Sequence, residues 1–211
     1  MEIKPITIVG CGPGALEYVT PAALREISHA QVLVGAKRLL ETFPDVAAER
    51  IVVGANVEQA LDALAARLGN SRIVVLVTGD PGLCSLARPV IRRFGRSACR
   101  VIPGISSVHA AFASIGLDWL GAQILSAHDT APSLDPSGLA QEEKLAVLAG
   151  NPANAAWVES LVGSLLPTHE IFLCENLTLA DESIRRLDNL QRPMNLASRS
   201  ILLFLRKAPR S

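Results

Sequence analysis

A regular alternation of short apolar runs and helical patterns constrains the fold of this chain more than any other feature. Within the first 120 residues, five runs rich in Val, Ile and Leu alternate with segments of helical character. These runs span residues 6–9, 32–34, 51–53, 74–77 and 101–102. Strands joined through helices pack as parallel neighbours in one sheet, with helices on both faces. The sequence therefore predicts an α/β fold with a doubly wound parallel sheet here.

Local signals support several of the helices. Thr20 followed by Pro21 is typical of a helix N-cap and first helical position. Val57, Leu61 and Leu64 recur at the spacing of one helical face, which predicts a helix over residues 56–68. Further helices are expected up to residue 43 and over residues 85–94 and 108–115.

The second part of the chain follows a different pattern. Strands are predicted at residues 123–126, 145–149, 170–174 and 200–205, with a helix ending near residue 165. Residues 130–138 are polar and contain proline, which predicts a loop. No helix follows the last strand, so some strands are expected to pair antiparallel in a mixed sheet. We expect two α/β domains, residues 1–120 and 121–211, with the boundary near residues 118–121.

Three of the predicted strands end in loops rich in glycine and proline. The strands ending at Val9, Val77 and Ile102 continue into residues 10–14, 78–82 and 103–107. In open α/β sheets, ligands bind at the carboxyl ends of the strands, and glycines let a ligand approach the backbone. The alternative is a plain strand-to-helix turn in which Asp80 caps the next helix. If the three strands are neighbours, their loops line one edge of the sheet.

Composition excludes several classes of protein. Twenty basic and twenty acidic residues give zero formal net charge, which argues against nucleic acid or a membrane surface as a partner. Hydrophobic residues make up 49% of the chain, as in a globular protein, but no apolar run reaches transmembrane length. The first residues lead directly into a strand, so we expect no signal peptide and a cytoplasmic location. Neither the four cysteines nor the histidines show metal-ligand spacing, so no metal is expected.

Residues 10–15 match the dinucleotide fingerprint G-x-G-x-x-A in letters only. In that motif, the helix begins within the glycines and faces a pyrophosphate. Here Pro13 interrupts the motif and the next helix waits until Pro21. The second strand is followed by Lys37 and Arg38 rather than by an acidic residue for the ribose. These departures disfavour a nicotinamide enzyme.

Charged and polar residues near strand ends offer candidate ligand contacts, each with a structural alternative. Lys37 and Arg38 suit an anionic ligand. His128 could act as a general base or be a surface histidine. Glu175 and Asn176 could belong to a site or cap a turn.

Five arginines lie in a stretch without acidic residues between Asp80 and Asp118. They could form a solvated helix face or attract a polyanion. These arginines are Arg88, Arg92, Arg93, Arg96 and Arg100.

Taken together, the three loops are more specific than any one of them. The segments 9–14, 79–82 and 101–107 closely resemble the tetrapyrrole methylase family, whose members use S-adenosylmethionine (SAM), and the resemblance covers nearly the whole chain. Within the family, the chain is most similar to the branch that methylates C5 of precorrin-7 and cobalt-precorrin-7 in cobalamin synthesis. The segments that indicate this branch are residues 35–40, 106–107, 126–128 and 175–177. After the histidine, the branch often continues with Gly-Arg, whereas this chain has Asp129 and Thr130.

The resemblance implies a homodimer of two-domain chains with a trough between the domains, where SAM and an anionic tetrapyrrole bind. It also implies the following site residues. Those implied for SAM are Pro13, Thr78, Gly79, Asp80, Leu83, Ser106, Ser107, Ala149 and Gly150. Those expected near the substrate are Gly12, Gly14, Lys37, Arg38, His128 and Asn176. A separate C15-methylating, decarboxylating enzyme is a further expected partner, because this chain is too short to contain that domain.

The expected reaction is transfer of a methyl group from the SAM sulfonium to a ring carbon, helped mostly by alignment. Loss of a proton from the ring requires a base, for which His128, Glu175 and Asp80 are candidates. Alternative functions are methylation of another ring carbon, or SAM or corrinoid binding without turnover.

Overall fold

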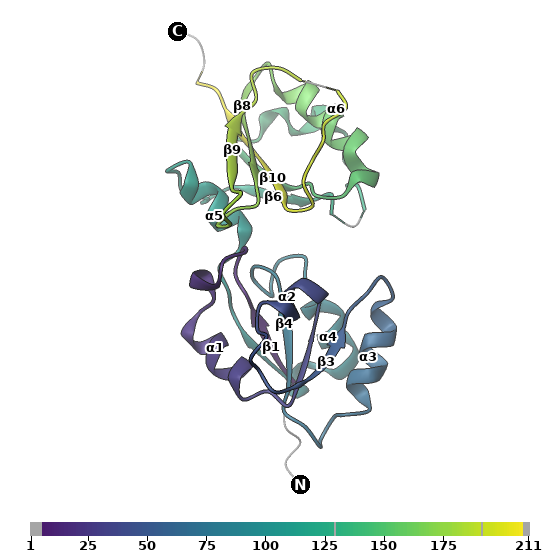
Figure 1. Cartoon of the computed structure of the whole chain (residues 1–211). Coiled ribbons are helices and arrows are strands. Elements are labelled where there is room, and N and C mark those ends of the chain that lie inside the picture. Colours follow the sequence, from purple (N-terminus) through teal and green to yellow (C-terminus); the bar gives the residue numbers. More distant parts are fainter. Residues whose placement is uncertain (1–5, 129, 191, 209–211) are drawn as a thin grey trace. The chain divides into compact units, whose positions relative to one another are not determined.

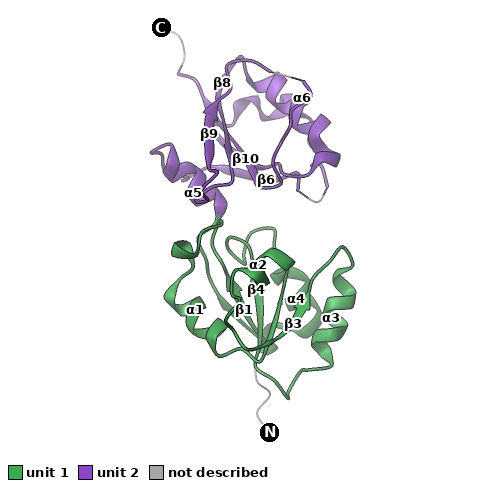
Figure 2. Cartoon of the chain, in the orientation of Figure 1, with its two compact units in different colours: residues 1–106 green, residues 107–211 purple. Residues whose placement is uncertain are grey.

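The computed structural model describes residues 6–128, 130–190 and 192–208 of the 211-residue chain. The chain divides into two compact units, the first ending at Ser106 and the second beginning at Ser107 (Figure 2). Within the described residues, each unit contains one five-stranded sheet. Among the described residues, no helix combines the length and apolar character needed to cross a bilayer.

The first unit is a parallel α/β sheet, as the alternating pattern predicts (Figure 1). Its strand order is β3-β2-β4-β1-β5, and every neighbouring pair is parallel. The strands are β1 (Ile6–Gly10), β2 (Val32–Gly35), β3 (Glu49–Val52), β4 (Ile73–Val77) and β5 (Cys99–Ile102). The helices are α1 (Pro21–Ser28), α2 (Lys37–Glu41), α3 (Val57–Ala65) and α4 (Ala87–Phe94), with short 3-10 turns at Leu16–Tyr18 and Arg96–Ala98.

Helices cover both faces of this sheet, and its three central strands β1, β2 and β4 are buried along their whole length. On one face, Ile8 and Val75 pack with Leu61 of α3 and Val90 of α4 in one buried cluster. The buried residues of α1 and α2 pack on the other face with Val9, Leu33 and Leu76. Figure 1 shows α1 and α3 on opposite sides of the sheet. Burial on both faces explains why nearly every residue of β1 and β4 is hydrophobic, with no alternation of apolar and polar positions.

The predicted starts of α1 and α3 are confirmed, whereas α4 begins two residues later than expected. The Thr20 hydroxyl accepts a hydrogen bond from the Ala23 amide at 3.2 Å, and Pro21 occupies the first turn of α1. Asn56 caps α3 by accepting from the Gln59 amide at 3.4 Å. These side chains satisfy amides that a helix leaves unpaired at its N-terminus. The late start of α1 is the feature that separates this fold from the dinucleotide motif.

The second unit contains the predicted mixed sheet, in the order β6-β7-β10-β8-β9. Only β6 and β7 pair in parallel; the other three pairs are antiparallel. Its strands are β6 (Gln123–Ser126), β7 (Lys144–Leu148), β8 (His169–Glu175), β9 (Ser183–Arg186) and β10 (Ser200–Arg206). Its helices are α5 (Ser107–Ser114) and α6 (Ala155–Leu165), with 3-10 segments η3 (Pro136–Gln141) and η4 (Pro152–Asn154). Helix α6 and η3 pack on one face of the sheet, and α5 lies against β10.

Three features differ from the sequence-based expectation. Helix α5 groups with the second unit because it packs on β10, so the division falls at residues 106–107 rather than near residue 120. Strand β9 was not predicted, because its sequence Ser-Ile-Arg-Arg carries little apolar pattern and it is an edge strand. The stretch expected to be a loop over residues 130–138 runs into η3, whose first turn Asp135 caps.

The three glycine-bearing loops of the first unit meet backbone to backbone. A Cβ atom added to Gly10 would lie 2.6 Å from the Gly104 nitrogen and 2.6 Å from the Gly79 oxygen. Real Cβ atoms do not approach backbone atoms this closely, so a side chain at this position forces the loops apart. The absence of a side chain at Gly10 is therefore a requirement of the loop arrangement.

We expect Gly10→Ala to destabilise the protein by about 2 kcal/mol, since overpacking against rigid backbone cannot be relieved by a rotamer change. Gly54→Ala is the matched control, because a Cβ there meets nothing within 4 Å. Urea unfolding followed by circular dichroism measures both. Equal unfolding midpoints for the two variants would contradict the close contact of the loops.

Candidate active site

The carboxyl ends of β4, β1 and β5 lie side by side, which confirms the sequence-based expectation that their loops share one edge. The Cys11 amide donates to the Val77 carbonyl at 2.8 Å, and the Gly79 amide donates to the Gly12 carbonyl at 2.7 Å. Beyond the parallel strands β1 and β4, the first two loops thus form an isolated antiparallel bridge between Gly12 and Gly79. Gly12 and Gly79 have φ of 72° and 66°, a left-handed conformation that favours glycine.

Asp80 joins the second loop to the third. One carboxylate oxygen accepts from the Gly82 amide at 2.7 Å, and the other accepts from the Gly104 amide at 3.0 Å. The first bond shapes the loop that carries Asp80, and the second fixes the loop after β5. Both oxygens therefore have positioning roles, a geometry that suits a fixed hydrogen-bonding group better than a mobile base.

The loop after β2 reaches the same edge through Arg38. Its guanidinium donates to the Thr78 hydroxyl at 2.6 Å, which ties the start of α2 to the loop after β4. Lys37 extends into solvent, where its ammonium lies 3.8 Å from Glu41 across one helical turn. An exposed pair of this kind contributes little to stability, so Lys37 is available to an anionic ligand.

The remaining first-unit residues predicted at the site differ in exposure. Pro13, Gly79 and Ser106 are buried, whereas Gly14, Thr78 and Leu83 are half-buried. Ser106 ends the first unit and the half-buried Ser107 opens α5 of the second. The edge therefore presents mostly backbone and short side chains.

Five predicted site residues of the second unit, with Asn176 beside Glu175, also gather at one sheet edge. Strands β6, β7 and β8 end there, which places His128, Ala149 and Glu175 in a row with the residues that precede β10. The Ala149 amide donates to the Ser200 carbonyl at 2.9 Å. Gly150 lies so close to the Ser198 backbone that a Cβ would overlap it. This approach explains why glycine stands at position 150.

His128 is exposed, and its backbone is anchored on both sides. Its amide donates to the Ser126 hydroxyl at 3.3 Å, and its carbonyl accepts from the Asn151 side chain at 2.6 Å. Within the part of the chain that the structure describes, its imidazole has no hydrogen-bond partner. Asp129, the departure from the family pattern, lies outside the described residues.

Glu175 and Asn176 have structural partners. One Glu175 oxygen accepts from the Ala197 amide at 3.0 Å and the Ser200 hydroxyl at 3.1 Å. Its other oxygen lies 4.0 Å from the Arg185 guanidinium. Asn176 has φ of 51° and donates to Asp181 at 2.8 Å. Both residues therefore shape the loops around the end of β8.

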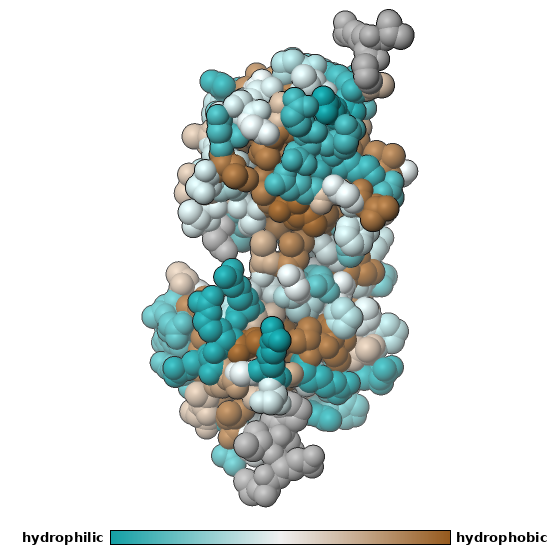
Figure 3. All heavy atoms as spheres, turned by 180° about the vertical axis from the view of Figure 1, so that it is seen from behind, coloured by the Kyte–Doolittle hydropathy of each residue, from teal (hydrophilic) through white to brown (hydrophobic). Residues whose placement is uncertain are grey.

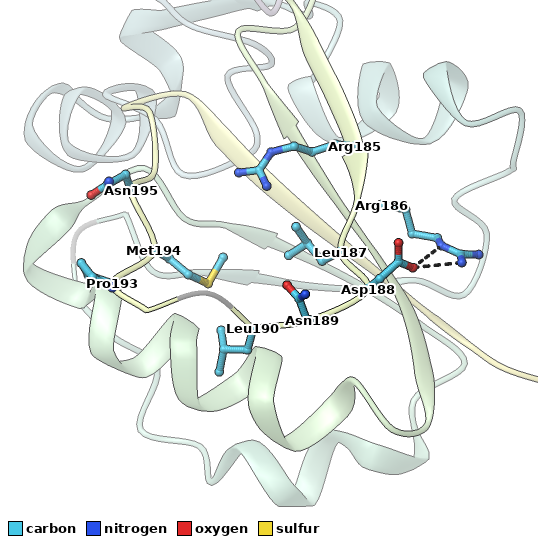
Figure 4. A pocket seen from close by; sticks show the side chains of 9 residues that line it. All are labelled: Arg185, Arg186, Leu187, Asp188, Asn189, Leu190, Pro193, Met194 and Asn195. Atoms are coloured by element: carbon cyan, nitrogen blue, oxygen red, sulfur yellow. Dashed lines mark hydrogen bonds and ion pairs between the residues drawn. The ribbon is translucent and has the colours of Figure 1, made fainter.

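A hollow of about 390 Å³ in the second unit contains no residue predicted at the site (Figure 4). Figure 4 shows Arg186 paired with Asp188, whereas Arg185 extends away from that pair. Arg185 connects this region to Glu175. The sequence did not predict Arg185 near the site, because no sequence pattern indicated strand β9. The lining residues are Arg185, Arg186, Leu187, Asp188, Asn189, Leu190, Pro193, Met194 and Asn195.

The sequence is similar to those of known methyltransferases over most of its length. The cobalt-precorrin-7 C(5)-methyltransferase of Salmonella typhimurium is 33% identical over 183 residues, which cover 86% of this chain and 90% of that protein. A probable cobalt-precorrin-7 C(5)-methyltransferase of Methanocaldococcus jannaschii is 30% identical over 185 residues, covering 85% and 87%.

Solved structures show the same fold. The precorrin-6Y methylase of Archaeoglobus fulgidus matches with a TM-score of 0.75 and 24% identity, covering 97% of this chain and all of that one. The uroporphyrin-III C-methyl transferase of Thermus thermophilus, complexed with S-adenyl homocysteine, matches with a TM-score of 0.73 and 21% identity, covering 95% and 97%. The sequence model of the tetrapyrrole (corrin/porphyrin) methylase family matches residues 5–191 of this chain. This chain therefore belongs to the tetrapyrrole methylase family.

Proposed function

We propose that this chain transfers a methyl group from SAM to C5 of precorrin-7 or cobalt-precorrin-7 in cobalamin biosynthesis. The observation that carries the choice of substrate is the similarity, over most of both chains, to relatives named for that reaction. The meeting of the three loops at Gly10, Gly79 and Gly104 supports a binding edge of the kind the reaction needs. We further propose a cytoplasmic enzyme that works alongside a separate C15-methylating, decarboxylating protein.

The residues at the first-unit edge fit SAM. Where Cβ atoms are absent, a ligand can reach backbone amides and carbonyls, which suits the amino-acid and ribose parts of SAM. Bound SAM would supply a methyl group on a positively charged sulfur. Thr78, Gly79, Asp80 and Leu83 would hold it from the loop after β4, and Pro13 from the loop after β1. The other proposed contacts are Ser106, Ser107, Ala149 and Gly150.

Alignment is the main contribution that we assign to the protein. In the transfer, the ring carbon forms a bond to the methyl carbon while the carbon–sulfur bond breaks, and the ring then loses a proton. Residues that fix both partners remove the entropy cost of this in-line approach. The hydrogen bonds of Asp80 give the loops a rigidity suited to that task.

Of the three candidate bases, we propose that His128 accepts the proton that the ring loses. The carboxylates of Asp80 and Glu175 already accept hydrogen bonds from protein groups, which gives them positioning roles in the loops. The imidazole of His128 is exposed and has no such partner among the described residues. His128, together with Gly12, Gly14 and Asn176, would also border the tetrapyrrole.

We also propose a homodimer. Leu117, Trp119 and Leu120 are exposed by 42%, 49% and 83%, and the Trp119 ring lies 4.4 Å from the His109 ring. Figure 3 shows hydrophobic residues exposed on both units, on the face of the molecule that it draws. A second copy would bury such surface. Sedimentation velocity of the purified chain tests this assembly, and a monomer at micromolar concentration would contradict it.

Product analysis tests the proposed reaction. Incubation with ¹³C-methyl SAM and cobalt-precorrin-7 should give a product one methyl group heavier, with the label at C5 by NMR. The same incubation with His128→Ala should slow turnover by about a hundredfold or more, the usual contribution of a general base. Label at another ring carbon, or no product from any precorrin of a panel, would refute the proposal.

We expect Asp80→Ala to weaken SAM binding by about tenfold to a hundredfold, since two hydrogen bonds to a charged group are lost. Asp80→Asn keeps one acceptor oxygen and should fall between this variant and the wild type. Asp45→Ala removes an exposed carboxylate of the same unit and serves as the control. Calorimetric titration with SAM measures all three, and unchanged affinity in Asp80→Ala would remove this loop from the cofactor site.

We expect Lys37→Ala/Arg38→Ala to raise the KM for the tetrapyrrole by about tenfold, because substrate carboxylates lose cationic partners. The double variant Arg25→Ala/Arg72→Ala removes the same charge from exposed positions of the same unit and should leave KM unchanged. An equal rise in both variants would indicate a general charge effect rather than a contact at the start of α2.

A further inference from the structure

The five arginines between residues 88 and 100 are all exposed, but they lie on three different elements and differ in their partners. Arg93 pairs with Asp62 of α3 at 3.1 Å, and Arg100 pairs with Glu26 of α1 at 2.9 Å. These two side chains connect neighbouring elements of the first unit. The other three arginines require a different explanation.

Arg88, Arg92 and Arg96 line one hollow of about 500 Å³, which we call the arginine hollow. Its other lining residues are Ile91, Cys99 and Val101, so it combines three guanidinium groups with an apolar floor. Among the residues that the structure describes, no carboxylate lines it, and none forms an ion pair with any of the three arginines. The arginine hollow is therefore a positively charged depression on a protein whose formal net charge is zero.

Protection of the sheet edge does not explain this arrangement. Strand β5 ends the sheet, and a charged side chain on such a strand prevents pairing with other chains. Arg100 on β5 already provides that charge. Arg88 and Arg92 instead come from α4, one turn apart, where like charges repel each other. Val101 remains 45% exposed on the floor beneath them.

The chemistry of the arginine hollow defines its ligand. Guanidinium groups bind carboxylates in charge-assisted and often bidentate hydrogen bonds. An apolar floor favours a ligand with a hydrophobic body, and the volume lies within the range of about 300–1,000 Å³ that is usual for small-molecule sites. A compound that carries several carboxylates around an apolar ring satisfies both requirements.

We propose that the arginine hollow is an accessory binding site for a polycarboxylate tetrapyrrole, separate from the loops at the strand ends. The identity of this ligand rests on the proposed function. The site holds the macrocycle through its carboxylates without presenting it to the loops after β4, β1 and β5. No residue of the arginine hollow belongs to those loops.

Calorimetric titration of the full chain with uroporphyrin III, a stable porphyrin octacarboxylate, tests the site. We expect Arg92→Gln/Arg96→Gln to weaken binding by about tenfold, and Arg92→Lys/Arg96→Lys to retain part of it. Arg25→Gln/Arg72→Gln is the matched control and should bind within about twofold of the wild type. Equal weakening in both Gln variants would overturn the proposal, as would an absence of binding to the wild type.

Cysteine labelling locates the bound porphyrin. Cys99 lines the arginine hollow, whereas Cys84 is exposed in the loop after β4. With uroporphyrin III bound, maleimide labelling of Cys99, measured by peptide mass spectrometry, should slow at least about fivefold while that of Cys84 continues. Protection of Cys84 alone would place the ligand at the strand-end loops and overturn the proposal. So would a decaglutamate peptide that protects Cys99 equally well, because the apolar ring would then contribute nothing.

The porphyrin-binding experiments and the methyl-transfer assay test two different proposals, and their outcomes can be distinguished. Binding in the arginine hollow without transfer from SAM would refute the proposed function and leave the polycarboxylate site in place. Transfer to C5 without porphyrin binding there would refute only the accessory site.

Discussion

The approach of three backbone segments at Gly10, Gly79 and Gly104 is the contact on which the first unit's functional edge depends. Strand pairing brings the segments to the same edge, and the missing side chain at Gly10 lets them touch. Asp80 then fixes the spacing through two amide hydrogen bonds. The edge is therefore shaped by backbone geometry, with few charged side chains, which suits a reaction governed by alignment.

Much of the fold could be predicted because its signals are local. The apolar strand runs, the period of α3 and the pair Thr20-Pro21 each act within a few residues. The parallel first sheet followed from alternation alone, and the order of β4, β1 and β5 then brought the three loops together. The family could be identified from the same loops, since the residues that carry the resemblance are also those that meet in space.

The remaining features depend on contacts between residues far apart in the chain. Strand β9 forms by antiparallel pairing with β8. Helix α5 belongs to the second unit because it packs on β10. The acceptor role of Glu175 comes from Ala197 and Ser200, more than twenty residues later. Likewise, the arginine run gave no indication that two members pair with Asp62 and Glu26 while three share a hollow.

Burial of Cys11 keeps its thiol unreactive beside the proposed methyl donor site. The thiol lies within the loop after β1, and burial raises its pKa to about 12, against smaller opposing effects of a Val77 hydrogen bond and the Arg38 charge. A thiol reacts with electrophiles as the thiolate, and almost none is present at neutral pH. If an activated methyl group is bound beside this loop, as we propose, Cys11 would not compete for it. The loop could then contain sulfur without risk of self-alkylation.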